Sequence, residues 1–234
     1  MSDVANRIKS AGYYGASISP ARFVAERIVS LAHLLPILEK CQVGFRGREF
    51  PRINRADTIP DRPDSIAQES TKYPQLEAWR FHQSGQFNIL SAVPTDWYQE
   101  MPGGTPAPAA WIKKGEYLFY EHVLMTFAQI FELAARLCNT PAGDEQMLVE
   151  ITVGGMKGRR LTPIDQMGNL DRVGTSGPAA MDEFKKEYQF SRSQLMAETG
   201  ALSVRATQHL YDRFGKSVPA ELLLEWYEAY GATR

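Results

Sequence analysis

The chain has few of the residues from which covalent or metal cross-links are built. Only two cysteines occur among 234 residues, Cys41 and Cys138, and each lies in an apolar pattern typical of a helix. Free cysteine behaves as a small hydrophobic side chain, so we expect two buried thiols. Two such positions cannot form a disulfide framework or a cysteine-based zinc site. This composition favours the reducing cytoplasm.

Long hydrophobic runs and an excess of charge of either sign are also missing. The longest apolar run covers residues 34–38, whereas a membrane-spanning helix needs about 20 such residues. No apolar run follows the charged residues near the N-terminus, so we expect no secretory signal. The formal net charge of −1 argues against binding polyanions over the whole surface. The sequence therefore predicts a protein that contacts no membrane.

The familiar signatures of catalysis and cofactor binding are absent as well. The histidines show no zinc-ligand spacing, and the chain contains neither a phosphate loop nor a G-x-S-x-G nucleophile motif. Residues 154–158, a glycine-rich stretch after an alternating run, are interpreted as a β-turn. We therefore expect no metal and no cofactor, and we assign no catalytic residue. Whether the protein is an enzyme stays uncertain, although these absences favour a non-enzymatic role.

One pattern keeps a nuclease alternative open. Glu183 and Lys185 have the E-x-K spacing of metal-dependent nucleases, and Asp165 or Asp171 could supply a further metal ligand upstream. The surrounding residues 181–188 alternate in charge, however, and are more typical of a solvated helix face than of a buried strand.

Periodicity predicts both strands and helices. Alternating aromatic residues on both sides of Gly85 predict a β-hairpin over 77–93, with Trp79 and Phe81 on its buried face. Apolar residues recur at helical spacing over 116–138, which predicts a central core helix above that hairpin. Residues 147–153 also alternate, and we expect 159–164 to return antiparallel as a second hairpin.

The remaining segments complete the expected fold. We expect a flexible N-terminal arm over residues 1–18 and a single α+β domain over 19–234. Its antiparallel sheet of two hairpins packs on the long helix, with an N-terminal helix and a helical C-terminal cap. That N-terminal helix begins at Pro20, and Ser191 begins the cap through a capping box with Gln194. Long loops are expected over three segments, 54–75, 99–110 and 165–180.

Basic residues form two clusters in the sequence. In the first cluster, four arginines fall within ten residues beside two phenylalanines, a mixture of bidentate donors and apolar anchors that favours recognition. The candidate residues for binding a partner or nucleic acid are Arg46, Arg48, Arg52 and Arg55 in the first cluster, and Lys157, Arg159 and Arg160 in the second. The alternative is that the phenylalanines are core residues and the arginines lie around them at the surface.

Several stretches resemble the region that follows the Alba-type, Schlafen-like DNA-binding domain in some bacterial proteins described as ATP-binding proteins or transcriptional regulators. The matching stretches are 43–51, 77–87, 151–159, the surroundings of Tyr188, and 210–215. That DNA-binding domain has no counterpart in these residues, so DNA binding is not carried over. The resemblance implies a sensor, adaptor or assembly module in a bacterial multi-protein system such as a defence system.

The function that the sequence favours is a non-enzymatic binding, sensor or assembly subunit that acts through contacts with another protein. Two alternatives stay open: a nucleic-acid-binding accessory protein that uses the arginine-rich clusters, and a metal-dependent nuclease. The sequence does not specify an oligomeric state.

Overall fold

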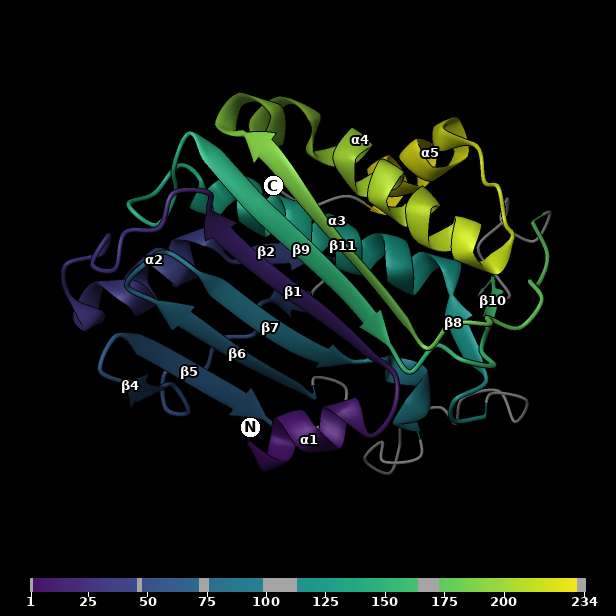
Figure 1. Ribbon diagram of the computed structural model, residues 1–234, viewed down its shortest axis with the longest axis horizontal. Coiled ribbons are helices and arrows are strands. Elements are labelled where there is room, and N and C mark those ends of the chain that lie inside the picture. The colour runs from purple at the N-terminus through teal and green to yellow at the C-terminus, as the bar shows by residue number, and fades with distance from the viewer. Residues whose placement is uncertain (1, 46–47, 72–75, 99–112, 164–172, 231–234) are drawn as a thin grey trace.

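The computed structural model describes residues 2–45, 48–71, 76–98, 113–163 and 173–230. Its main element is a seven-stranded sheet with the order β11–β9–β1–β7–β6–β5–β4, in which all neighbours are antiparallel (Figure 1). Its strands are β1 (Tyr13–Pro20), β4 (Ile59–Arg62), β5 (Ser65–Ser70), β6 (Glu77–His82), β7 (Phe87–Ala92), β9 (Gln146–Gly154) and β11 (Glu183–Ser191). The expected α+β fold is confirmed.

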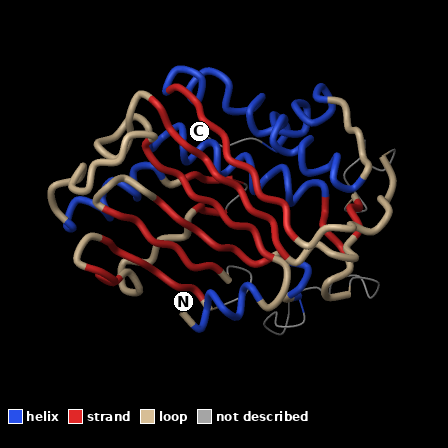
Figure 2. The backbone as a smooth tube through the Cα atoms, viewed as in Figure 1, coloured by secondary structure: helices blue, strands red, loops and turns tan. Residues whose placement is uncertain are grey.

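Helices cover one face of this sheet, behind the strands in Figures 1 and 2. They are α2 (Leu34–Cys41), α3 (Tyr120–Leu137), α4 (Arg192–Tyr211) and α5 (Ala220–Tyr230). The core lies between these helices and the sheet; the ring of Phe131 on α3, for example, meets Tyr188 and Phe190 of β11 edge-on. Cys41 and Cys138 are buried free thiols, as expected.

Two small sheets complete the fold. One pairs β2 (Val43–Phe45) with β3 (Arg48–Phe50) antiparallel, and the other pairs β8 (Tyr117–Phe119) with β10 (Arg160–Thr162) in parallel. The parallel pair differs from the second hairpin expected over 147–164, which is therefore wrong. The chain leaves β9 through two glycines with positive φ, Gly155 and Gly158, and this turn directs it towards β8 instead of back along β9.

The predicted hairpin over 77–93 and the long helix are confirmed as β6, β7 and α3. Trp79 and Phe81 are buried in the main core, as predicted. The helix α3 packs mainly against α4, and its closest strands are β2, β8, β1 and β9. The indole N–H of Trp79 instead donates to the carbonyl oxygen of Arg52 (2.9 Å), so the segment after β3 contributes to the cover over this side chain.

The N-terminal region differs most from expectation. Residues 1–18 are not a flexible arm, because residues 13–20 form β1, which pairs with β7 on one side and β9 on the other. The expected helix from Pro20 is also wrong, since Pro20 ends β1 and α2 begins only at Leu34. Pairing on both sides satisfies the backbone of β1, and its inward positions include the small residue Ala16, so the apolar alternation is weak in the sequence.

The C-terminal third contains a second difference. Residues 183–191 form the edge strand β11, whereas residues 181–188 were expected to be more typical of a solvated helix face. The helix α4 begins at the predicted capping box of Ser191 and Gln194 and runs to Tyr211, with a kink at Glu198. Charged residues on one side of an exposed edge strand disguise its apolar alternation.

Of the three expected loops, only the first lies mostly within the described residues. Residues 54–75 contain the antiparallel pair β4–β5, so the prediction of an irregular loop is wrong there. The predicted loop over 99–110 lies outside the described residues, as does most of the loop over 165–180. Pro60 and the charged residues of β4 are compatible with its place at the edge of the sheet.

Candidate functional site

The front face of the large sheet is the candidate site, because the described helices other than α1 (Asp3–Lys9) do not cover it (Figure 1). Val4 and Ile8 of this helix join Leu76 and Trp97 in a small apolar cluster at one end of β6 and β7. The hydroxyl oxygen of Ser2 accepts from the amide of Ala5 (3.1 Å) and caps the helix. Helix α1 therefore forms an end wall, and the strands beyond it remain open.

Register places small side chains at the centre of this open face. Gly15 of β1 pairs with Leu90 of β7 and with Thr152 of β9. Two residues further along β1, Ser17 pairs with Asn88 of β7. A Cβ atom at residue 15 would lie 3.3 Å from a methyl carbon of Leu90. Glycine avoids this contact and leaves the space above the strand open.

Charged side chains flank this hollow on both sides. On the β4–β6 side, Arg80 forms an ion pair with Asp61 (2.6 Å). On the β9–β11 side, Lys185 forms an ion pair with Glu150 (3.0 Å), which raises the pKa of the lysine. The charges therefore lie on the outer strands, while the centre is polar and uncharged.

One edge of the hollow is linked to α1. The hydroxyl of Tyr13 donates to Glu183 of β11 (3.1 Å), and burial together with this carboxylate raises the pKa of Tyr13. The ammonium group of Lys9, in the last turn of α1, lies 5.8 Å from the ring centroid of Tyr13. These three residues close the corner between the end wall and β11.

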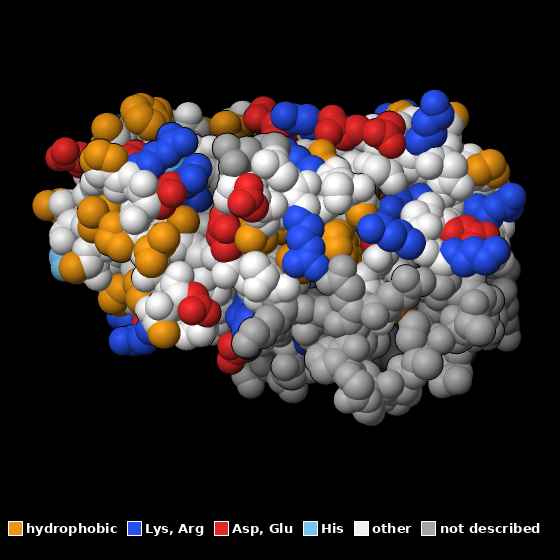
Figure 3. Space-filling view, turned by 90° about the horizontal axis from the view of Figure 1, so that it is seen from below, with side chains coloured by type: hydrophobic (Ala, Val, Ile, Leu, Met, Phe, Trp, Pro, Cys, Tyr) orange, Lys and Arg blue, Asp and Glu red, His pale blue; other side chains and the backbone are white. Residues whose placement is uncertain are grey.

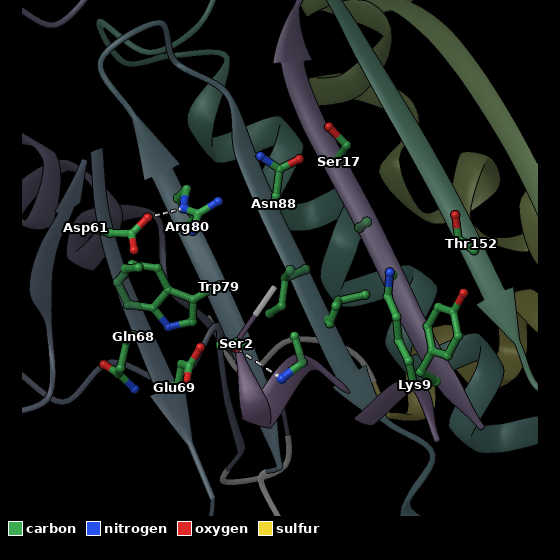
Figure 4. A pocket seen from close by; sticks show the side chains of 18 of the residues that line it. Ser2, Lys9, Ser17, Asp61, Gln68, Glu69, Trp79, Arg80, Asn88 and Thr152 are labelled. Carbon is green, nitrogen blue, oxygen red and sulfur yellow. Dashed lines mark hydrogen bonds and ion pairs between the residues drawn. The ribbon is translucent and has the colours of Figure 1, made fainter. Parts of the chain in front are cut away.

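Together these elements form a groove of about 930 Å³ on the front of the sheet (Figure 4). Figure 4 shows Arg80, Asn88, Ser17 and Thr152 on neighbouring strands across its floor, with Lys9 at the α1 end. Because the lining reaches from β4 to β11, the groove crosses six inter-strand spacings, or roughly 29 Å. An extended polypeptide of about nine residues has this length.

The first basic cluster lies away from this groove, on β3 and the loop that follows it. The side chain of Arg48 is exposed, and Arg55 makes a bidentate contact with Glu39 of α2 (2.7 and 2.6 Å). Phe45 and Phe50 are core residues, which is the arrangement of the alternative reading. Arg46 lies outside the described residues.

In the same cluster, the main chain of Arg52 binds the sheet. Its amide donates to the carboxylate of Glu77 (2.8 Å), and burial raises the pKa of Glu77 to about 7. Its carbonyl oxygen accepts from Gln68 and Trp79. This residue therefore fastens the segment after β3 to the sheet. That the cluster binds a partner or nucleic acid remains a prediction.

The second basic cluster divides into one buried and two exposed residues. Arg159 is only 2% exposed and forms a bidentate ion pair with buried Asp96. Lys157 and Arg160 are exposed, in the turn before β10 and in β10 itself. The expected role of Arg159 in surface binding does not fit its burial, because a guanidinium enclosed by its counter-ion cannot reach a ligand outside. The Asp96 partner lies 63 residues away, so no local pattern indicates it.

Another surface feature is the loop between β1 and α2. Phe23 and Val29 are 77% and 84% exposed, although Arg27 fastens the loop to Asp144 (2.9 Å). Seen from below, hydrophobic side chains gather at the left end of the molecule, where this loop lies, and charges of both signs are interspersed elsewhere (Figure 3). Nothing in the described residues indicates what would cover the two side chains.

Comparison with protein-family models, curated proteins and solved structures found no match. The resemblance to the region after the Schlafen-like DNA-binding domain therefore remains a prediction. Within the described ranges, no helix has both the length and the apolar character needed to cross a membrane. In those ranges, too, no three side chains of His, Cys, Asp or Glu are grouped as a metal site requires.

The groove is the feature that sequence reasoning missed. Its floor and flanks come from seven strands, and Ser17, Arg80, Asn88 and Lys185 line one groove only because of the register of these strands. The alternation of Tyr14, Ala16 and Ile18 is the local signal that could have placed Ser17 on an outward face.

Proposed function

We propose that the protein is a non-enzymatic binding subunit that holds an extended polypeptide segment of another protein in the groove on the front of the sheet. The observation that carries the proposal is the groove itself: an open, polar floor with small central side chains, closed at one end by α1. Antiparallel sheets commonly pack one face on the core and leave the other in solvent, so this face is accessible to a ligand.

Charge favours a polypeptide over a nucleic acid as the occupant. More carboxylates than cations line the groove. The carboxylates are Asp57, Asp61, Glu69, Glu150 and Glu183, and the cations are Lys9, Arg80 and Lys185. A phosphodiester backbone needs an excess of positive charge, since its affinity comes largely from neutralised phosphates. A polypeptide with side chains of both signs can instead match both flanks.

The side chains that line the groove give little support to the nuclease alternative. Glu183 and Lys185 both lie on the groove side of β11, but their neighbours are the Tyr13 hydroxyl and the Glu150 carboxylate. The other expected ligands, Asp165 and Asp171, lie outside the described residues. Nuclease activity that requires added Mg²⁺ and is lost in Glu183→Ala would favour this alternative over the binding subunit.

A substitution on the groove floor tests the proposal. In Ser17→Trp, an indole occupies the centre of the groove, while strand pairing through the main chain of β1 is kept. The matched control is Met196→Trp, at a position on α4 that is 58% exposed and behind the sheet. A displayed library of random peptides of about twelve residues is selected on the wild-type protein, because this length exceeds the span of the groove.

Selected peptides labelled with fluorescein are then titrated and followed by fluorescence anisotropy. We expect Ser17→Trp to weaken binding at least about tenfold, and Met196→Trp to change it less than about twofold. A library that yields no binder, or binders whose affinity is unchanged in Ser17→Trp, would contradict the proposal. A labelled oligothymidine serves as the nucleic-acid probe; tight binding of this probe that Ser17→Trp abolishes would also overturn it.

A further inference from the structure

A cluster of basic side chains, here called the β11–α4 cluster, lies on the other side of β11, where this edge strand meets α4. Alternate residues of β11 face the helices, and these include Lys186, Tyr188 and Phe190. After the turn at Ser191, α4 runs back along the strand, so its residues meet those of β11 in reverse order. On α4, Arg205 and His209 are four residues apart and share one face.

The contacts fix how the two elements are aligned. The guanidinium carbon of Arg205 lies 5.9 Å from the ring centroid of Phe190. One step further, the ring of His209 is stacked on that of Tyr188, with centroids 6.1 Å apart and planes at 12°. Four residues of helix rise about 6 Å, and two residues of strand about 6.7 Å. Four residues after His209, Arg213 therefore lies beside Lys186, which is two residues before Tyr188 in the strand.

Hydrogen bonds define the protonation of the central histidine. The ammonium group of Lys186 lies 2.9 Å from Nδ1 of His209, and the Tyr188 hydroxyl lies 3.1 Å from the same atom. A lysine ammonium can only donate, so Nδ1 accepts and the ring is neutral. The other ring nitrogen, Nε2, then carries a hydrogen and remains a donor.

Nearby carboxylates neutralise only part of the positive charge of the β11–α4 cluster. Three cations, Lys186, Arg205 and Arg213, meet one nearby carboxylate, Asp212. In the described part of the chain, none of these cations has a carboxylate within 4 Å. Burial, followed by the charges of Arg213 and Arg205, lowers the pKa of Lys186. Burial and the charge of Lys186 likewise lower the pKa of His209.

We propose that the β11–α4 cluster is a binding site for a phosphate group, either inorganic phosphate or the phosphate monoester of a small molecule. Lys186, Arg205 and Arg213 supply the charge, and the N–H groups of the arginines and of His209 supply directional donors. Guanidinium groups bind phosphate oxygens in bidentate fashion, and a doubly charged anion offsets the repulsion among the three cations. The site is independent of the groove, because it lies on the opposite side of β11.

Neighbouring lysines on β11 provide a matched pair of variants. Lys186→Gln removes one positive charge from the β11–α4 cluster, whereas Lys185→Gln removes one positive charge from the groove side of the same strand. Binding of inorganic phosphate is measured by isothermal titration calorimetry at constant ionic strength, with chloride as the balancing anion. Adenosine monophosphate is the monoester probe. Arg213→Gln, at an exposed position, is the second variant if Lys186→Gln does not fold.

We expect phosphate binding to the wild type and to Lys185→Gln, and a dissociation constant raised at least about tenfold in Lys186→Gln and in Arg213→Gln. Tighter binding of adenosine monophosphate than of phosphate would identify a monoester as the ligand, and equal binding would identify the free anion. No saturable binding to the wild type overturns the proposal. Equal losses in the two lysine variants, or binding of an oligonucleotide only, would show a nonspecific anionic attraction and also overturn it.

Discussion

The ion pair between Asp96 and Arg159 gives the sharpest test of how the fold is held together. One carboxylate oxygen accepts from Arg159 and from the amide of Gly115 (both 2.8 Å). The other accepts from the amide of Gly12 (2.7 Å) and from a second guanidinium nitrogen. This carboxylate thereby connects segments next to β1, β8 and β10, and both charged side chains are almost completely buried.

Removal of one partner leaves the other charge buried without compensation. Such a change costs about 3–5 kcal/mol, a large part of a typical unfolding free energy of about 5–15 kcal/mol. Asp96→Ala should be the more damaging substitution, because it also leaves the buried amide of Gly12 without an acceptor, at roughly 1–3 kcal/mol, and removes the acceptor of the Gly115 amide. Arg159→Ala leaves those amides bonded to the carboxylate. We therefore expect Asp96→Ala to lower stability more than Arg159→Ala.

Urea denaturation followed by tryptophan fluorescence measures these free energies. In the double variant no charge is left alone, so its loss should be smaller than the sum of the single losses by about 2 kcal/mol or more. Asp96→Asn keeps the shape and one acceptor oxygen, and it provides a milder variant if Asp96→Ala does not fold. The exposed pair of Lys185 and Glu150 is the control, and its removal should leave the urea midpoint unchanged. Additive losses within about 0.5 kcal/mol would refute the reasoning.

Three further predictions concern the hairpin and the residues around it. Trp79→Ala removes a buried ring and should cost about 3–5 kcal/mol, and an unchanged melting temperature would contradict its place in the core. Glu77, whose pKa burial raises from 4.5 to about 7, holds its proton more tightly when folded; stability should fall by about 3 kcal/mol between these pH values. Glu77→Gln should remove this fall, and an identical pH profile would show that another group is responsible. Gly85→Ala should cost at least about 1–3 kcal/mol, since φ is +87° and the added Cβ would lie 2.1 Å from the carbonyl oxygen of Ala142; wild-type stability in urea would exclude this clash.

The elements predicted correctly from the sequence are those whose formation depends mainly on residues close together in the chain. The hairpin over 77–93 is held by a short turn at Gly85 and by alternating aromatic residues, and α3 by a broad apolar face, so both follow from local patterns in the sequence. The capping box of Ser191 and Gln194 likewise needs only two residues three apart. Burial of Trp79 follows from alternation alone.

The parts that were not predicted depend on distant partners. Tyr13–Pro20 becomes a strand because β7 and β9 satisfy its backbone, and the weak apolar alternation within the segment does not by itself decide this. Arg159 looks like a surface residue until Asp96 is placed beside it. In β11, one side faces the groove and the other faces α4, and the side chains of Lys185 and Lys186 therefore lie on opposite sides of the strand although the residues are adjacent.

The central place of β1 has a consequence for the order in which the molecule can fold. In the large sheet, β7 and β9 are joined only through β1, which precedes both of them in the chain. Tyr13 pairs with Ala92 on one side and with Gly154 on the other. During synthesis, β1 leaves the ribosome long before either partner exists, and contacts between such distant residues form slowly. The two halves of the sheet therefore cannot be joined until synthesis has passed Gly154.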